Sequence, residues 1–184
     1  MSRLTIYRDD APLVAELDTP DEALIREGLA RINVRFERWA AQQSLASTDQ
    51  DEDVLAAYQP EIQRLEHAHA YRAVDVLRCM PDHPQREQMR AKFLAEHTHD
   101  DDEVRFFVEG AAMFYLHADE RVHMVLCERN DLISVPARMR HWFDMGPEPL
   151  FTVIRMFTTP EGWVARFTGD PIAARFPAFD RQAA

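Results

Sequence analysis

The second half of the chain most constrains its fold, because after about residue 93 it consists of short apolar segments separated by turn-type residues. The segments are rich in β-branched and aromatic residues, as β-strands are. They cover residues 104–108, 111–117, 122–127, 132–136, 140–145, 151–157 and 163–167. Many short strands with such punctuation are typical of a β-sandwich or β-barrel. We therefore predict a mainly β fold in which Glu109-Gly110 forms one of the turns.

The first half mixes helices and strands. RLTIYR and the alternating INVRFERW predict strands, as does RAVDVLRCM. Thr19-Pro20-Asp21-Glu22 predicts a helix start with Thr19 as the capping residue. QQSLASTDQDED predicts a loop leading into a helix, and a second helical pattern runs from Pro60 through Ala68. We expect one domain over residues 1–184, with additions at about 1–92 packed on a core at about 93–170, and a tail at 171–184.

The charge and the cysteines limit which partners and which cellular compartment we expect. The formal net charge is −11 and the basic residues are scattered, which disfavours nucleic acid and anionic membranes as partners. No apolar run is long enough to span a bilayer, and Asp9 and Asp10 interrupt any signal peptide. Cys79 and Cys127 lie in apolar runs, so buried free thiols are the simplest interpretation and a disulfide is the alternative. We expect a cytoplasmic protein.

Residues 96–110, EHTHDDDEVRFFVEG, carry a candidate metal site. In a strand, residues of like parity share a face, so His97 and His99 project together, as do Glu103 and Arg105 where the extended conformation resumes. Imidazole and carboxylate donors suit Fe(II), Ni(II), Mn(II) or Zn(II). The alternative is a solvated acidic turn between strands.

A near copy of this motif serves as an internal control. Glu66-His67-Ala68-His69 repeats the order of Glu96 to His99, but it lies at the end of a predicted helix. Residues i and i+2 of a helix point about 200° apart, so they do not share a face. Ala73 also stands at the counterpart of Glu103. We predict that His67 and His69 are surface residues.

The spacing of the first motif resembles the cupin superfamily. His97, His99, Glu103 and Gly110 match the core of the first cupin motif, and Pro136 and His141 match part of the second. Glycines common in these motifs are replaced by Ala91, Asn130 and Arg138. The segments AEHTHDDDEVRFFVEG, LISVPARMRHWFDMG and TVIRMFTTPEGWVARFTGD are further similar to the acireductone dioxygenase family of methionine salvage, over about residues 70 to 170. The resemblance implies a cupin-type β-barrel (double-stranded β-helix, or jelly roll) with N-terminal additions.

The resemblance implies a cofactor and a reaction. One Fe(II) or Ni(II) per chain would be held by His97, His99, Glu103 and His141, leaving two positions for the oxygens of an enediol. The substrates would be dioxygen and the acireductone 1,2-dihydroxy-3-keto-5-(methylthio)pentene. The iron form would give 4-methylthio-2-oxobutanoate and formate, and the nickel form methylthiobutanoate, formate and carbon monoxide. The family likeness favours a monomer.

It also assigns roles to residues around the metal. Arg105 would generate and stabilise the substrate dianion, Glu96 would take part in metal incorporation, and Asp102 would pass on local conformational changes. The residues matching the substrate pocket are Phe93, Phe106, Phe143, Arg155 and Trp163. Each has a plainer alternative: a paired strand arginine for Arg105, solvated loop acids for Glu96 and Asp102, and barrel core for the aromatic residues.

Two other functions compete with this one. The first is another metal-dependent cupin, either a different dioxygenase or an isomerase, against which Arg105 and its EHTH context argue. The second is a non-enzymatic cupin that binds a small molecule. Such proteins often lack metal ligands, whereas all four candidate ligands are present here.

Overall fold

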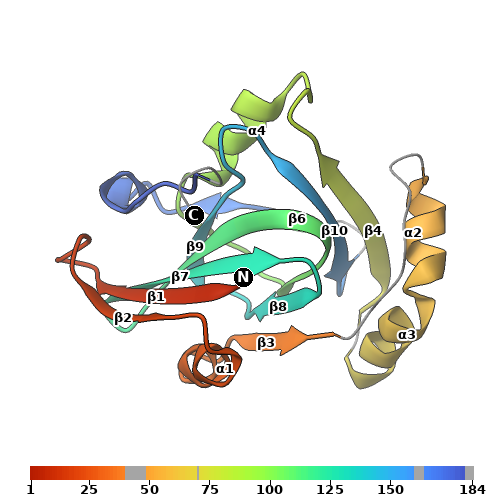
Figure 1. Ribbon diagram of the computed structural model, residues 1–184, viewed down its shortest axis with the longest axis horizontal. Coiled ribbons are helices and arrows are strands. Elements are labelled where there is room, and N and C mark those ends of the chain that lie inside the picture. Colours follow the sequence, from red (N-terminus) through yellow and green to blue (C-terminus); the bar gives the residue numbers. More distant parts are fainter. Residues whose placement is uncertain (40–48, 70, 160–163, 181–184) are drawn as a thin grey trace.

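A computed structural model describes residues 1–39, 49–69, 71–159 and 164–180 (Figure 1). The strands are β1 (Arg3–Arg8), β2 (Ala15–Thr19), β3 (Arg35–Arg38), β4 (Ala73–Cys79), β5 (His97–Thr98), β6 (Glu103–Ala118), β7 (Arg121–Glu128), β8 (Asp131–Val135), β9 (Arg140–Asp144), β10 (Leu150–Phe157) and β11 (Arg166–Phe167). The helices are α1 (Glu22–Ala30), α2 (Asp51–Ala57), α3 (Gln59–Ala68), α4 (Arg86–Phe93) and the 3-10 helix η1 (Pro171–Arg175). The fold is mainly β, as predicted.

The strand β6 organises the sheet, because it pairs with four other strands. Its first half lies between β8 and β10, and its second half lies between β7 and β9. β4 and β3 extend the first half, while β1 and β2 on one side and β5 and β11 on the other extend the second. In the described part of the chain these hydrogen-bonded pairs do not close the sheet into a complete ring.

Gly110 does not form the predicted turn, because it lies inside β6. The residue has φ +74° and marks the bend between the two halves of the strand. A Cβ atom at this position would lie 1.7 Å from the carbonyl oxygen of Leu150 on β10. A glycine here therefore permits a bend and a close strand contact, and residues 104–108 and 111–117 belong to one strand.

Alternation along β6 divides the apolar side chains between two cores. Phe107 and Phe114 belong to the larger core, together with Leu4 of β1 and Leu29 of α1. Val104, Phe106 and Val108 face the other way and pack against the α2 and α3 region. Its contributions include Val54 of α2, Ile62 and Leu65 of α3, and Tyr58 between the two helices. Figure 1 shows these two helices beside β4. The N-terminal additions thus cover the sheet.

The first half differs from the prediction in its details. The predicted strands correspond to β1, β3 and β4, and α3 confirms the helix after Pro60. Helix α1 is capped by Asp21, whose carboxylate accepts from the Leu24 N–H at 3.0 Å, and not by Thr19. Thr19 instead ends the unpredicted strand β2. Helix α4 was also not predicted.

The cysteines agree with the simpler sequence-based interpretation. Cys79 and Cys127 are buried free thiols. Within the described segments, no helix has the length and apolar character needed to cross a membrane.

Candidate metal centre

Three segments bring four donor side chains together. His97 lies on β5, His99 in the turn that follows, Glu103 at the start of β6, and His141 on β9. His97 and His141 are cross-strand partners. One donor atom from each of the four residues lies within 4.8 Å of the others, and all four side chains are buried. This arrangement of three imidazoles and a carboxylate could hold one metal ion.

Backbone carbonyls orient two of the imidazoles. Nδ1 of His97 lies 2.7 Å from the Ala95 oxygen, and Nδ1 of His141 lies 2.8 Å from the Met139 oxygen. Because a carbonyl oxygen only accepts, each Nδ1 carries the hydrogen and donates it. Each Nε2 therefore keeps a lone pair that can bind a cation shared with the other members of the group, as in metal-binding histidines.

Electrostatics and burial respectively keep Glu103 ionised and His97 neutral, the forms in which they bind cations. Burial opposes ionisation of Glu103, but Arg105, His141 and His99 outweigh it and hold its pKa well below the usual range. Arg105 Nη2 lies 2.8 Å from Glu103 Oε1, and Nε2 of each of these two histidines lies 3.1 Å from Oε2. Burial is the main cause that lowers the pKa of His97 to about 4. At neutral pH the site thus contains an ionised carboxylate beside a neutral His97.

A cavity of about 570 Å³ opens beside this group. Its lining includes His97, His99 and Arg105, together with Ala73, Val74, Asp75, Lys92, Phe93, Phe143, Arg155, Phe157, Ala165 and Phe167. Arg105 is only 4% exposed, and its guanidinium carbon lies 4.2 Å from the Phe143 ring centre. Phe93 contacts the same ring edge-on, with 6.0 Å between centres. The cavity thus combines a cationic wall with aromatic surface.

Arg105 has a second arginine as its neighbour. Arg155 of β10 is the cross-strand partner of Arg105 on β6. The Arg155 guanidinium donates to both carboxylate oxygens of Asp75 on β4, at 2.8 and 2.6 Å. Each arginine of this wall is therefore matched by a carboxylate.

The residues proposed for the substrate pocket occupy three kinds of position. Phe93, Phe143 and Arg155 line the cavity. Phe106 does not: it projects from the opposite face of β6, stacks on Trp39 at 4.4 Å and is 2% exposed. Phe106 follows Arg105 directly in the strand, so the alternation of side chains already placed it on the opposite face. Trp163 lies outside the described residues.

Glu96 points away from the donors but is not a solvated loop acid. It is 1% exposed, and its Oε1 lies 2.6 Å from His117 Nδ1 on β6. Its Oε2 accepts from the Thr168 hydroxyl at 2.7 Å, and the Thr168 N–H donates to the Glu96 carbonyl. Glu96 therefore connects the histidine-bearing segment to β6 and to the chain after β11.

The acids between His99 and Glu103 join separate segments. Asp102 accepts from the Ala137 N–H at 2.9 Å, in the loop that precedes β9. Asp101 accepts from the N–H and the hydroxyl of Thr158, just after β10. The turn is therefore fastened to both chain segments that flank the site.

The control motif does not form a site. His67 lies in the last turn of α3 with its Nδ1 2.6 Å from the Gln63 carbonyl. His69 lies just beyond the helix with its Nε2 2.6 Å from an Arg35 nitrogen. Both side chains are exposed, as predicted.

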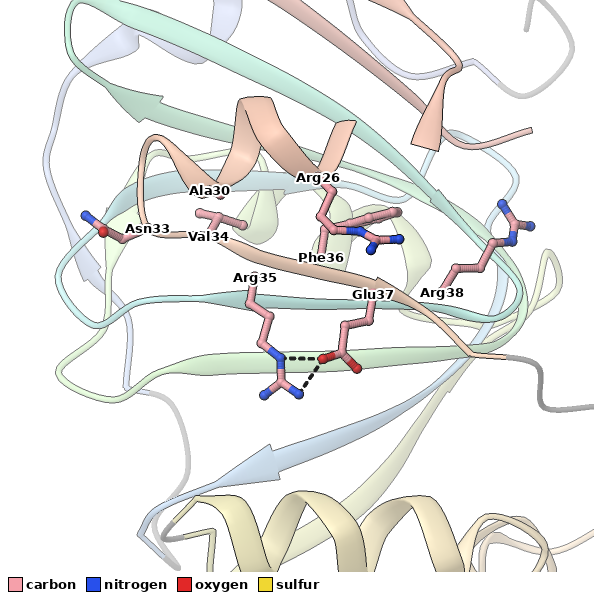
Figure 2. Close-up of a pocket in the computed structure, with 8 residues that line it drawn as sticks. All are labelled: Arg26, Ala30, Asn33, Val34, Arg35, Phe36, Glu37 and Arg38. Carbon is pink, nitrogen blue, oxygen red and sulfur yellow. Dashed lines mark hydrogen bonds and ion pairs between the residues drawn. The ribbon is translucent and has the colours of Figure 1, made fainter. Parts of the chain in front are cut away.

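A second hollow, of about 560 Å³, lies between α1 and β3 (Figure 2). Its lining includes Arg26, Arg35 and Arg38. Each of these arginines has an acidic partner: Arg26 pairs with Glu22, Arg35 with Glu37 at 2.7 Å, and Arg38 approaches Asp131 at 3.8 Å. The charges of this hollow are therefore largely compensated within the protein.

The mainly β fold and the buried group of three imidazoles and one carboxylate define a candidate metal-binding protein. The ARD/ARD' family model matches residues 3–165. An acireductone dioxygenase of Parvibaculum lavamentivorans is 57% identical over 182 residues, with 99% of both chains covered. That of Yersinia enterocolitica is 53% identical, covering 98% of this chain and 100% of the relative. The chain therefore belongs to the ARD/ARD' family of acireductone dioxygenases.

A solved structure agrees with this assignment. The acireductone dioxygenase from Bacillus anthracis with a cadmium ion in its active centre superposes with a TM-score of 0.78. It is 27% identical, and the match covers 91% of this chain and 98% of the other.

Proposed function

We propose that this protein cleaves 1,2-dihydroxy-3-keto-5-(methylthio)pentene with dioxygen, as a step of methionine salvage. The buried group of His97, His99, Glu103 and His141, beside a cavity that also contains Arg105, carries the proposal. The names of the relatives support this substrate class.

We assign these four residues as ligands of one Fe(II) or Ni(II). Neutral imidazoles and one carboxylate fit a borderline divalent cation. When bound, the ion would supply Lewis acidity that favours the ionised enediol. It would also hold the enediol where the enediol can react with dioxygen. The protein fixes the donors beforehand through the carbonyls of Ala95 and Met139.

Arg105 is the proposed catalytic residue. Its buried guanidinium lies against Phe143, away from bulk water, where charge interactions are strong. A guanidinium can donate two parallel hydrogen bonds to adjacent oxygens, which matches an ionised enediol. Its positive charge lowers the cost of removing the second enediol proton.

The aromatic side chains provide the complementary surface for the rest of the substrate. Phe93, Phe143, Phe157 and Phe167 line the cavity that contains the charged residues. Apolar walls with a few placed polar groups are typical of small-molecule sites, and they suit a methylthio tail.

Carbon balance corrects one of the expected products. The substrate has a five-carbon chain, so loss of one carbon as formate leaves the four-carbon 4-methylthio-2-oxobutanoate. Loss of a second carbon as carbon monoxide leaves three carbons, so the nickel reaction gives 3-methylthiopropanoate and not methylthiobutanoate. In both reactions the two oxygen atoms of dioxygen enter the acids that are formed. We propose that metal supply decides between the two outcomes, because both ions accept these ligands.

Metal analysis combined with product analysis tests the proposal. Purified protein should contain about one divalent ion per chain and accelerate acireductone decay under oxygen, with carbon monoxide formed only by the nickel-loaded protein. His141→Ala should lose metal and activity together, whereas His67→Ala, the matched control, should lose neither. No acceleration over the uncatalysed decay would reject the substrate, and equal metal loss in both variants would reject the ligand assignment.

A further inference from the structure

Lys92, the only lysine in the chain, lies at the metal-site cavity. It belongs to the last turn of α4 and lines the cavity together with His97, His99 and Arg105. Every other residue counted among the lysines and arginines is an arginine. The side chain is exposed, so it stands on the solvent side of a cavity whose donor group is buried.

Two contacts fix Lys92 relative to the proposed ligands. Arg90 of α4 donates to both oxygens of the fully buried Asp144, at 2.7 and 3.0 Å, and Asp144 ends the strand that carries His141. Phe93 packs edge-on against Phe143 of the same strand. Lys92 lies between these two anchors in sequence, so its Cα position is set even though its side chain is long.

Lys92 also differs from the other cations of the cavity in its charge balance. Arg105 is matched by Glu103 at 2.8 Å, and Arg155 by Asp75 at 2.6 Å. Among the residues that the structure describes, no carboxylate lies within ion-pair distance of the Lys92 ammonium. The uncompensated positive charge of the lining is therefore on Lys92.

The proposed substrate needs such a charge. An enediol conjugated with a ketone is a vinylogous acid, so it reaches the protein as an anion. The chain carries a formal charge of −11, which repels anions at long range. An uncompensated cation at a cavity mouth reverses this effect locally, and an ammonium on a flexible stem can follow a ligand inward.

We infer that Lys92 captures the anionic reductone at the entrance and guides it toward Arg105. The inference rests on the proposed function and assigns a substrate-binding residue outside the set derived from the family resemblance. Because Lys92 acts on encounter, its removal affects kcat/KM more than kcat.

Kinetics of charge variants test this role. In Fe(II)-loaded protein at low ionic strength, Lys92→Gln should lower kcat/KM roughly three- to tenfold, with kcat changed less than about twofold. Its kcat/KM should also depend less on salt than that of the unchanged protein. Lys92→Arg should retain most of kcat/KM. Arg86→Gln, which removes one charge from the other end of α4, is the matched control and should have no effect.

A second measurement does not depend on turnover. Because the chain has a single ε-amine, an amine-acetylating reagent should modify one lysine, which mass spectrometry of peptides quantifies. With oxygen excluded, the acireductone can bind without being consumed. It should then slow acetylation of Lys92 but not that of the N-terminal amine.

The outcomes separate the two proposals. Wild-type protein that accelerates acireductone decay while Lys92→Gln matches Arg86→Gln overturns the role of Lys92 alone. Equal acetylation rates of Lys92 with and without the anaerobic substrate also overturn it. Wild-type protein without any acceleration rejects the proposed function, and the inference falls with it.

Discussion

Two residues of the second motif keep a glycine conformation without being glycine. Asn130 and Arg138 stand where cupins commonly have glycine, and their φ angles are +78° and +66°. The Arg138 N–H donates to the His99 carbonyl at 2.7 Å, so this left-handed turn contacts a segment that bears a proposed ligand. Asparagine tolerates this region, whereas a long side chain incurs roughly 1–2 kcal/mol of strain there. At these two positions the residue types differ from the cupin motif, but the backbone keeps the conformation that a glycine would adopt.

Arg138→Gly should therefore stabilise the protein by about 0.5–1 kcal/mol, because relief of strain exceeds the greater chain entropy of glycine. Asn130→Gly is the control and should change stability by less than about 0.5 kcal/mol. Denaturant unfolding of both metal-loaded variants checks this. A less stable Arg138→Gly would show that its exposed side chain contributes more than its strain.

At the scale of residues, the sequence predicted the neighbours that depend on side-chain alternation and on motif spacing. Strand parity predicts the shared face of Glu103 and Arg105 on β6, whereas His99 joins His97 from just beyond the end of β5. His141 required the family resemblance, because nothing local places a distant strand beside β5. The burial of Glu96 depends on Thr168 and His117, which approach only in the folded chain.

At the scale of elements, the errors occurred where the local signal was ambiguous or absent. Gly110 gives the same signal in a turn and in a bent strand, and only the opposing Leu150 distinguishes them. Helix α4 buries no residue fully, so it lacks an apolar stripe, and β2 is mostly exposed. The strands with strong apolar patterns, such as β7 and β10, were predicted correctly.

Gly110→Ala should prevent normal folding or cost more than about 3 kcal/mol, because the added methyl group collides with backbone and cannot rotate away. Gly169→Ala is the matched control: its φ is +78°, but among the described residues no atom apart from those of its chain neighbours lies within 4 Å of the added Cβ. It should cost only about 1 kcal/mol of backbone strain. Soluble yield and thermal unfolding compare the two, and equal effects would refute the importance of the Leu150 contact.

At the scale of the molecule, metal binding should stabilise the fold. A ligand that binds only the folded state at about a hundredfold excess over Kd adds about 2.7 kcal/mol, which corresponds to a Tm shift of roughly 5–10 °C. Chelation should therefore lower the Tm of wild-type protein and of His67→Ala by this amount. It should leave the Tm of His141→Ala unchanged, and a similar shift in that variant would place the metal elsewhere.

Stability should also depend on pH through Asp131. Burial raises the pKa of this fully buried carboxyl to about 6, although Ser2 and the Glu128 N–H both donate to it. The folded state then holds a proton more tightly than the unfolded state, so this contribution to stability is greatest below about pH 4 and is lost as pH rises to about 6. The loss is on the order of 3 kcal/mol.

Asp131→Asn removes this titration. Its stability relative to wild type should increase between pH 4 and pH 7 by about that amount in chelator-treated protein, measured by denaturant unfolding. Asp82→Asn, at an exposed position, is the control. A constant difference between Asp131→Asn and wild type across this range would contradict the prediction.

The pairing of β6 with four strands has a consequence for how the site opens. The peptide groups of β6 are hydrogen-bonded along both edges of the strand. Its first residue, Glu103, supplies the carboxylate of the donor group. Amides of this strand can exchange with deuterium only when most of the sheet comes apart. We expect them to be the slowest in the molecule, with exchange slowed further by a bound ion. The carboxylate of Glu103 is therefore held by the part of the sheet that opens last, so it should keep its place while less stable elements unfold locally.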